Sequence, residues 1–154
     1  MVRTWKKIRQ LLAAGGRSLH AVAPGDTVLA ALKAMAEKDV GALAVIADGR
    51  LVGILSERDC VRRVDLQGRA AKDTAVSVIM TAEVITVAPD HGLDHCLLLM
   101  RRHRLRHLPV VENGRVLTVL SSRDVLEEVI AQEEHLIRAL ESDRLMMTTD
   151  TGTY

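Results

Sequence analysis

The sequence predicts a mixed α/β (α+β) fold in which two similar units are related by a pseudo-twofold axis. Residues 19–64 align without gaps on residues 84–129, with 14 identities among 46 positions at a constant offset of 65. Each copy passes through strand-like and helix-like patterns in the order β-α-β-β-α. A unit of this size is too small to bury both its sheet and its helices, so we expect the two copies to pack together as one domain.

Each copy begins with a short strand that is followed by a helix. The strands are expected to end at Pro24 in the first copy and at Pro89 in the second. The helices are expected over residues 28–38 and 93–103, because leucine and methionine recur there at helical spacing in both copies.

A β-hairpin follows in each copy. In the first copy two apolar runs, residues 42–47 and 51–55, are separated by Asp48-Gly49, a dipeptide that favours a tight hairpin turn. The second copy has Asn113-Gly114 at the same place. The hairpin therefore predicts two adjacent antiparallel strands in each unit.

Further helices are predicted at both ends of the chain. Residues 3–14 form an amphipathic pattern that includes Ile8, and we expect this helix to pack against the repeats. Residues 122–145 read as one long helix with apolar residues among acidic ones. This helix either folds back on its own domain or meets a partner chain. We favour a partner, and at least a homodimer, because the stripe from Leu126 to Leu140 is too long for a chain this small to cover.

These patterns divide the chain into four parts. They are an N-terminal helix and lead-in over residues 1–17, the first repeat over 18–77, the second repeat over 78–134, and a C-terminal helix extension with a flexible tail over 135–154.

Composition excludes several classes of protein. The net charge of +1 gives no overall attraction for nucleic acid or for an anionic membrane. The chain has no Phe, one Trp and one Tyr, so side chains that stack on exposed bases are scarce. The two cysteines do not have the spacing of a disulfide or zinc framework, and the N-terminus lacks the apolar stretch of a leader. No apolar run reaches the roughly 18 residues that span a membrane, so we expect a soluble cytoplasmic protein.

A short polar motif recurs where each second helix is expected to begin. Ser56 and Asp59 in the first copy, and Ser121 and Asp124 in the second, have the spacing of a capping box. In that motif a hydroxyl and a carboxylate satisfy the free amides of the first helical turn. Capping alone explains these residues, but its duplication at matching places also fits a ligand contact.

The segments around this motif resemble a known family. GILSERD at Gly53–Asp59 and TVLSSRD at Thr118–Asp124 resemble the signature of CBS domains, and VIMTAEVITV and RLRHLPVVENGRV resemble stand-alone proteins that carry a tandem CBS pair. The resemblance implies a regulatory sensor that is not an enzyme. It would bind an adenine nucleotide between its repeats, signal through an unidentified partner protein, and associate as a homodimer. AMP, NAD(H), ATP and S-adenosylmethionine all remain open as the ligand.

The resemblance also implies two sites, each built crosswise from both copies. One site combines Ser56 and Asp59 with Thr81, Ile85, Leu105 and Arg106, and the other combines Ser121 and Asp124 with His20, Val40 and Gly41. Adenine would lie between aliphatic side chains. Thr118 stands where the first copy has Gly53, and we expect its bulk to weaken the second site.

Cationic residues near these sites are candidates for binding the phosphates. Arg106 and His107 belong to the basic run at residues 101–107, and the resemblance implies that this neighbourhood faces the phosphates of the nucleotide, which Arg can bind bidentately. Arg58 and Arg123 stand at helix starts, where a cation is unfavourable unless an anion is near. All four are therefore assigned to the nucleotide site.

A metal- or redox-responsive interaction module without nucleotide is the alternative function. His91 and His95 lie one helical turn apart and could chelate a metal, but no further ligand converges with them in the sequence. Cys60 and Cys96 read most simply as small buried side chains. No nucleophile elbow, P-loop or GxGxxG motif indicates catalysis.

Overall fold

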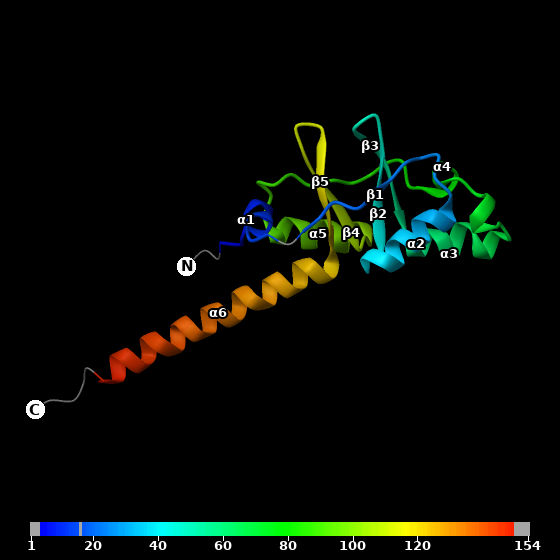
Figure 1. Cartoon of the computed structure of the whole chain (residues 1–154). Coiled ribbons are helices and arrows are strands. Elements are labelled where there is room, and N and C mark those ends of the chain that lie inside the picture. The colour runs from blue at the N-terminus through cyan, green and yellow to red at the C-terminus, as the bar shows by residue number, and fades with distance from the viewer. Residues whose placement is uncertain (1–3, 16, 150–154) are drawn as a thin grey trace, which may run out of the picture.

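The computed structural model describes residues 4–15 and 17–149, and it confirms the predicted fold class. Two β-hairpins stand side by side, with helices packed around their bases (Figure 1). In chain order the elements are α1 (Ile8–Ala13), β1 (Ala21–Val22), α2 (Val28–Lys38), β2 (Ala42–Ala47), β3 (Arg50–Ser56), α3 (Glu57–Arg63), the 3-10 turns η1 (Asp65–Gln67) and η2 (Ala71–Asp73), α4 (Val76–Ile79), α5 (Leu93–His103), β4 (His107–Glu112), β5 (Arg115–Ser121) and α6 (Ser122–Thr149).

The predicted hairpins are present in both copies. Asp48 and Gly49 have φ values of 51° and 76°, and Asn113 and Gly114 have 51° and 77°, so both residues of each turn are left-handed, as a tight hairpin turn requires. β2 and β3 pair antiparallel, as do β4 and β5.

The strand that opens each copy is shorter than the sequence pattern indicated. β1 has two residues and pairs parallel with β2. In the second copy the equivalent strand is reduced to one parallel bridge between Val87 and Val110. The first sheet therefore has the order β1-β2-β3, and the second contains β4 and β5.

The first long helix of each copy, α2 and α5, has the bounds that the sequence predicts. Both helices end at a residue in the left-handed conformation, Asp39 with φ 53° and Arg104 with φ 54°. Such a residue reverses the chain direction, so both copies return from helix to strand through the same geometry.

The hydrophobic core has two centres, one in each copy. The segment that precedes each copy, which we call its lead-in, carries a short helix, α1 for the first copy and α4 for the second, and each of these helices packs against the other copy. Ile8 and Leu11 of α1 precede the first copy but pack in the core of the second, with Leu93 and Leu120. The opposite exchange occurs in α4, whose apolar side chains join the core of the first copy. The copies are thus joined by exchanged helices as well as by contacts between their sheets.

The predicted N-terminal helix over residues 3–14 was too long. Residue 3 lies outside the described residues, and α1 begins at Ile8. The backbone before it is extended: Lys7 forms an antiparallel bridge with Gly92, and the carbonyl of Lys6 accepts a hydrogen bond from the amide of Leu93 at 3.0 Å. Because the Lys6 carbonyl accepts this bond and the Ile8 amide donates to the carbonyl of His91 at 3.0 Å, neither group can take part in the i to i+4 pattern of a longer helix.

The predicted C-terminal helix is present as α6, which leaves the rest of the molecule and extends away from it (Figure 1). Leu136, Ile137 and Leu140 have exposed fractions of 46%, 52% and 60%. The helix therefore does not fold back on its own domain beyond its first turns. The flexible tail predicted at the C-terminus falls partly on residues 150–154, outside the described residues. Among the described residues, no helix is both long and apolar enough to span a membrane.

Candidate functional site

Both predicted capping boxes are formed. The Ser56 amide donates to Asp59 Oδ2 at 3.0 Å, and the Asp59 amide donates to Ser56 Oγ at 3.1 Å. At the start of α6 the Ser121 amide donates to Asp124 Oδ2 at 2.9 Å, and the Asp124 amide donates to Ser121 Oγ at 3.1 Å. Each box fixes one carboxylate oxygen and leaves the second oxygen for other partners.

Asp59 lies on a cavity of about 180 Å³, which we call the Asp59 cavity. One wall comes from β3 and α3 of the first copy, and the other comes from the lead-in and strand entry of the second copy. Its lining residues are Ile54, Ser56, Arg58, Asp59, Thr81, Glu83, Val84, Ile85, Arg104, Leu105, Arg106 and His107.

Asp124 lies on a larger cavity of about 550 Å³, which we call the Asp124 cavity. Here the motif comes from the second copy, and the lead-in and strand entry come from the first. Its lining residues are Ser18, His20, Asp39, Val40, Gly41, Ala42, Arg106, His107, Val119, Ser121, Ser122, Arg123, Asp124 and Glu127.

The structure brings together all the residues that the sequence assigned to the two sites. The Asp59 cavity contains Ser56, Asp59, Thr81, Ile85, Leu105, Arg106, His107 and Arg58, and the Asp124 cavity contains Ser121, Asp124, His20, Val40, Gly41, Arg123 and again Arg106 and His107. Their role in binding a nucleotide stays a prediction. The arrangement is crosswise because the lead-in of each copy runs beside the Ser and Asp motif of the other copy.

Sequence reasoning missed other lining residues. Val119, Asp39 and Ser18 lie 65 positions from Ile54, Arg104 and Glu83 in the opposite cavity. The repeat offset, applied to every residue beside the motif, would have found them. It would not have found Glu127, which enters the Asp124 cavity one turn along α6.

The glycine in the first motif has a different purpose from the one that the sequence suggested. A Cβ atom on Gly53 would lie 2.6 Å from Met80 Sδ and 3.0 Å from the carbonyl oxygen of Thr81. The space therefore admits the segment that leads into the second copy, and neither Gly53 nor Thr118 is among the residues that line the Asp59 or the Asp124 cavity. Thr118 Oγ1 instead donates to the carbonyl of Ser18 at 3.4 Å. The space at Gly53 thus has a structural explanation within the chain, and the expected weakening of the second site by Thr118 stays a prediction.

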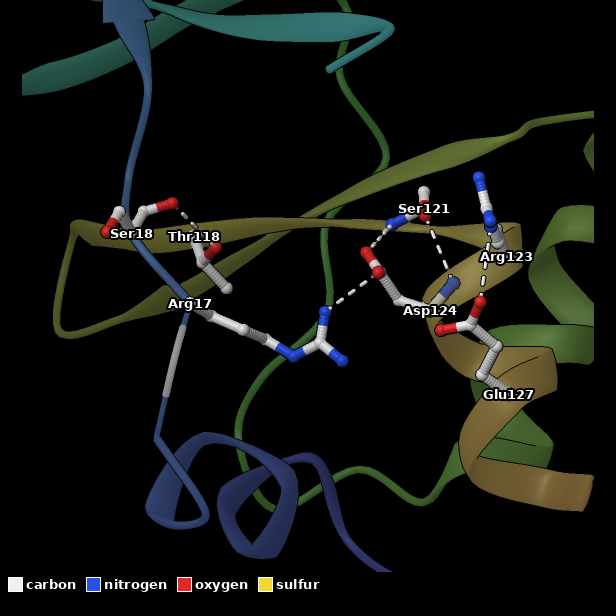
Figure 2. Close-up of polar contacts among 7 residues, drawn as sticks. All are labelled: Arg17, Ser18, Thr118, Ser121, Arg123, Asp124 and Glu127. Carbon is white, nitrogen blue, oxygen red and sulfur yellow. Dashed lines mark hydrogen bonds and ion pairs between the residues drawn. The ribbon is translucent and has the colours of Figure 1, made fainter. Parts of the chain in front are cut away.

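The carboxylate of Asp124 has a cationic partner that the sequence did not predict. Arg17 Nη1 lies 3.0 Å from Asp124 Oδ1, and the guanidinium reaches across from the lead-in to α6 (Figure 2). Burial alone would raise the pKa of Asp124, but the hydrogen bonds from Ser121 and Arg17 outweigh it and lower the pKa below its ordinary 3.8. The carboxylate is therefore ionised at neutral pH.

His107 stands between the two cavities at the start of β4. Its ring faces Gly41, where an added Cβ would lie 3.4 Å from Nε2. Burial lowers the pKa of His107 from 6.5; Asp124 acts in the opposite sense, and Arg106 lowers the pKa further. The ring is therefore neutral at pH 7, and Arg106 supplies the positive charge that both cavities share.

The residues of the metal and redox alternative have other contacts. His91 Nδ1 accepts a hydrogen bond from the Ala88 amide at 3.0 Å, and its ring centroid lies 4.5 Å from that of His95. Within residues 4–15 and 17–149, no group of three His, Cys, Asp or Glu side chains is placed to hold a metal ion. Cys60 and Cys96 are buried, and burial, chiefly, raises the pKa of both thiols to about 11.

Comparisons with known proteins agree on the repeat unit. The family model described as the CBS domain matches residues 16–66 and 75–131. The chain is 38% identical over 120 residues to the CBS domain-containing protein CBSX3, mitochondrial, of Arabidopsis thaliana, covering 75% of this chain and 58% of that protein. It is 31% identical over 112 residues to the CBS domain-containing protein YhcV of Bacillus subtilis, covering 73% of this chain and 79% of that protein.

Solved structures share the fold. A candidate signal-transduction protein with CBS domains from Burkholderia ambifaria superposes with a TM-score of 0.78 at 43% identity, covering 82% of this chain and 95% of the other. The CBS domain pair of protein MJ0100, solved with 5'-methylthioadenosine and S-adenosyl-L-methionine, has a TM-score of 0.71 at 21% identity, covering 84% and 99% of the two chains. At that identity the second likeness concerns the fold alone.

Proposed function

The chain belongs to the CBS-domain family and is a CBS pair, a regulatory module; from this we propose that it senses an adenine nucleotide bound in its crosswise cavities. The observation that carries the proposal is the pair of capping-box carboxylates, each of which faces a cavity walled by the other copy. In this proposal the chain senses and does not catalyse, and its output passes to a partner protein.

The carboxylate oxygen that each capping box does not use is suited to the ribose. Asp59 and Asp124 use Oδ2 in the capping box, so Oδ1 can accept hydrogen bonds from the 2′ and 3′ hydroxyls of a nucleoside. Hydrogen bonds to an ionised carboxylate are about twice as strong as bonds between neutral groups. The ribose would thus be the part of the ligand that both cavities read in the same way.

The remaining walls fit the base and the phosphate. Ile54, Val84 and Ile85 give the Asp59 cavity aliphatic surfaces that can enclose a purine without aromatic stacking. Arg106 lines both cavities and is exposed, so its guanidinium can bind a phosphate bidentately. Both ligands of the MJ0100 pair are adenosine compounds, which supports the same class of ligand here.

The test is a calorimetric titration with AMP and with adenosine. Asparagine at position 59 or 124 keeps an oxygen that can serve the capping box, so Asp59→Asn should melt close to wild type. Asp124→Asn should melt slightly below it, because it also loses the ion pair with Arg17. Each substitution should lower the affinity of its own cavity about 10- to 150-fold, the range expected for a lost hydrogen bond to a charged group. Arg106→Ala should weaken AMP much more than adenosine.

The controls separate a ligand contact from capping. If both asparagine variants bind AMP as tightly as wild type, the carboxylates are caps alone and the proposal fails. If no adenosine compound gives heat or raises the melting temperature at millimolar concentration, the sensor function is refuted as a whole.

We also propose that the partner of the exposed α6 face is a second copy of the chain. Leu136, Ile137 and Leu140 repeat at the spacing by which two helices pack, and they are exposed beyond the reach of the chain's own core. Light scattering at micromolar concentration should therefore give twice the monomer mass. A monomer would refute this part of the proposal without touching nucleotide binding.

A further inference from the structure

Arg17 distinguishes the two cavities. Its Nη1 lies 3.0 Å from Asp124 Oδ1, the oxygen that the Ser121 capping box leaves free (Figure 2). The side chains of Arg17 and Asp124 are 24% and 30% exposed, so the pair is partly shielded from water. The cation thus lies where the proposed function places the ribose hydroxyls.

The Asp59 cavity has no equivalent contact among the described ion pairs. Position 82, which lies 65 residues after Arg17, is alanine. The cation near Asp59 is Arg63, whose Nε is 4.0 Å from Asp59 Oδ1, and its Nη1 donates to the carbonyl of Ile79 at 2.8 Å. The cation nearest Asp59 Oδ1 in these ion pairs is therefore farther away than the one at Asp124 Oδ1.

The chain segments on both sides of Arg17 are anchored to the rest of the molecule. Before it, α1 is attached to the second copy through Arg9, whose guanidinium bonds Asp90 at 3.0 Å and Glu112 at 2.6 Å. After it, the carbonyl of His20 accepts from the Ala44 amide at 3.3 Å. Between these anchored segments, the side chain of Arg17 extends to the carboxylate of Asp124, which lines the Asp124 cavity.

We propose that Arg17 is a specificity-determining residue that competes with the ligand's ribose for Asp124 Oδ1. The inference rests on the proposed function. It makes the two cavities unequal: the Asp59 cavity binds a nucleoside directly, while the Asp124 cavity binds it only when Arg17 leaves the carboxylate. The larger of the two cavities is thus the one whose carboxylate is occupied by Arg17.

The test measures the Asp124 cavity alone, in an Asp59→Asn background, with adenosine as the probe. Arg17→Gln should raise the affinity for adenosine about two- to fivefold, which corresponds to removing a partly exposed ion pair. Arg17→Lys keeps the charge and is the matched control, with affinity near that of the Asp59→Asn parent. Urea unfolding of each variant checks that the fold is intact.

Ionic strength provides a second readout, because adenosine carries no charge and salt acts only on the protein's ion pair. Raising the salt from about 50 to 500 mM should strengthen adenosine binding when Arg17 is present and leave the Arg17→Gln variant unchanged. A salt effect of equal size in both proteins would overturn the inference.

The remaining outcomes separate this inference from the proposed function. If the parent binds adenosine and Arg17→Gln does not bind it more tightly, the competition is refuted and the sensor function stands. If Arg17→Gln weakens AMP but leaves adenosine unchanged, Arg17 is a phosphate ligand and the competition is again refuted. If the wild type and all variants bind neither compound, both proposals fail together.

Discussion

Replacing Gly53 with alanine should destabilise the protein more than the size of a methyl group indicates. The added Cβ would lie 2.6 Å from Met80 Sδ and 3.0 Å from the carbonyl oxygen of Thr81. The end of the methionine side chain can rotate away, but the carbonyl cannot, because it accepts the Ile54 amide at 2.9 Å and the Thr81 amide donates back at the same distance.

The magnitude follows from these contacts. Overpacking at a rigid position costs about 1–3 kcal/mol. Weakening the two hydrogen bonds between Ile54 and Thr81 adds about 1 kcal/mol, so we expect the free energy of unfolding to fall by about 2–4 kcal/mol in total. Because Thr81 also lines the Asp59 cavity, adenosine binding there should weaken as well.

Urea unfolding at one fixed protein concentration measures the loss. Gly25→Ala is the matched control, since no atom lies within 4 Å of its added Cβ and its φ is not positive. That variant should stay within about 1 kcal/mol of wild type, in the stabilising direction. A Gly53→Ala protein as stable as Gly25→Ala would refute the idea that the lead-in is held by close backbone contact with β3.

Three further outcomes are expected. Cys60 and Cys96 should not react with Ellman's reagent at pH 8 until the protein unfolds, because a thiol with a pKa of about 11 is roughly one part in a thousand thiolate at that pH; rapid reaction of the folded protein would contradict their burial. Asp124 has a lowered pKa in the folded state, so its stabilisation is complete above the ordinary value of 3.8 and is lost as the pH falls through the lower folded value. Chemical unfolding of wild type and Asp124→Asn should therefore give a stability difference that narrows below pH 3.8, and a constant difference would argue against the ion pair. Ile137→Glu places a charge on a side chain that is 52% exposed, so light scattering should show monomers while the melting temperature at high dilution stays unchanged.

The features that the sequence predicted well are those set by residues close together in the chain. The turn at Asp48-Gly49 and the capping boxes at Ser56 and Ser121 each depend on three or four consecutive residues, and all are present. The bounds of α2 and α5 also depend on local spacing. The crosswise cavities were implied by the resemblance to CBS domains, and the repeat relates the residues of one cavity to those of the other by the offset of 65.

The features that it missed depend on contacts between distant residues. Arg17 and Asp124 are far apart in the chain, and the offset leads from Arg17 only to Ala82, which carries no charge. Lys7 reads as helical from its amphipathic surroundings, but it pairs with Gly92 of the second copy. The first motif's glycine could not be explained from sequence, because the atoms that need its space belong to Met80.

The long C-terminal helix gives this small chain a mechanical property. Its first two turns contribute Asp124 and Glu127 to a cavity wall, and the same 28-residue helix then extends away from the rest of the molecule. At 1.5 Å per residue the rod is about 42 Å long, so a tilt of about 5° at its root would carry its far end about 3–4 Å. A change at the cavity that is too small to repack the core would thus move the far end of α6 by a distance that a neighbouring protein can detect.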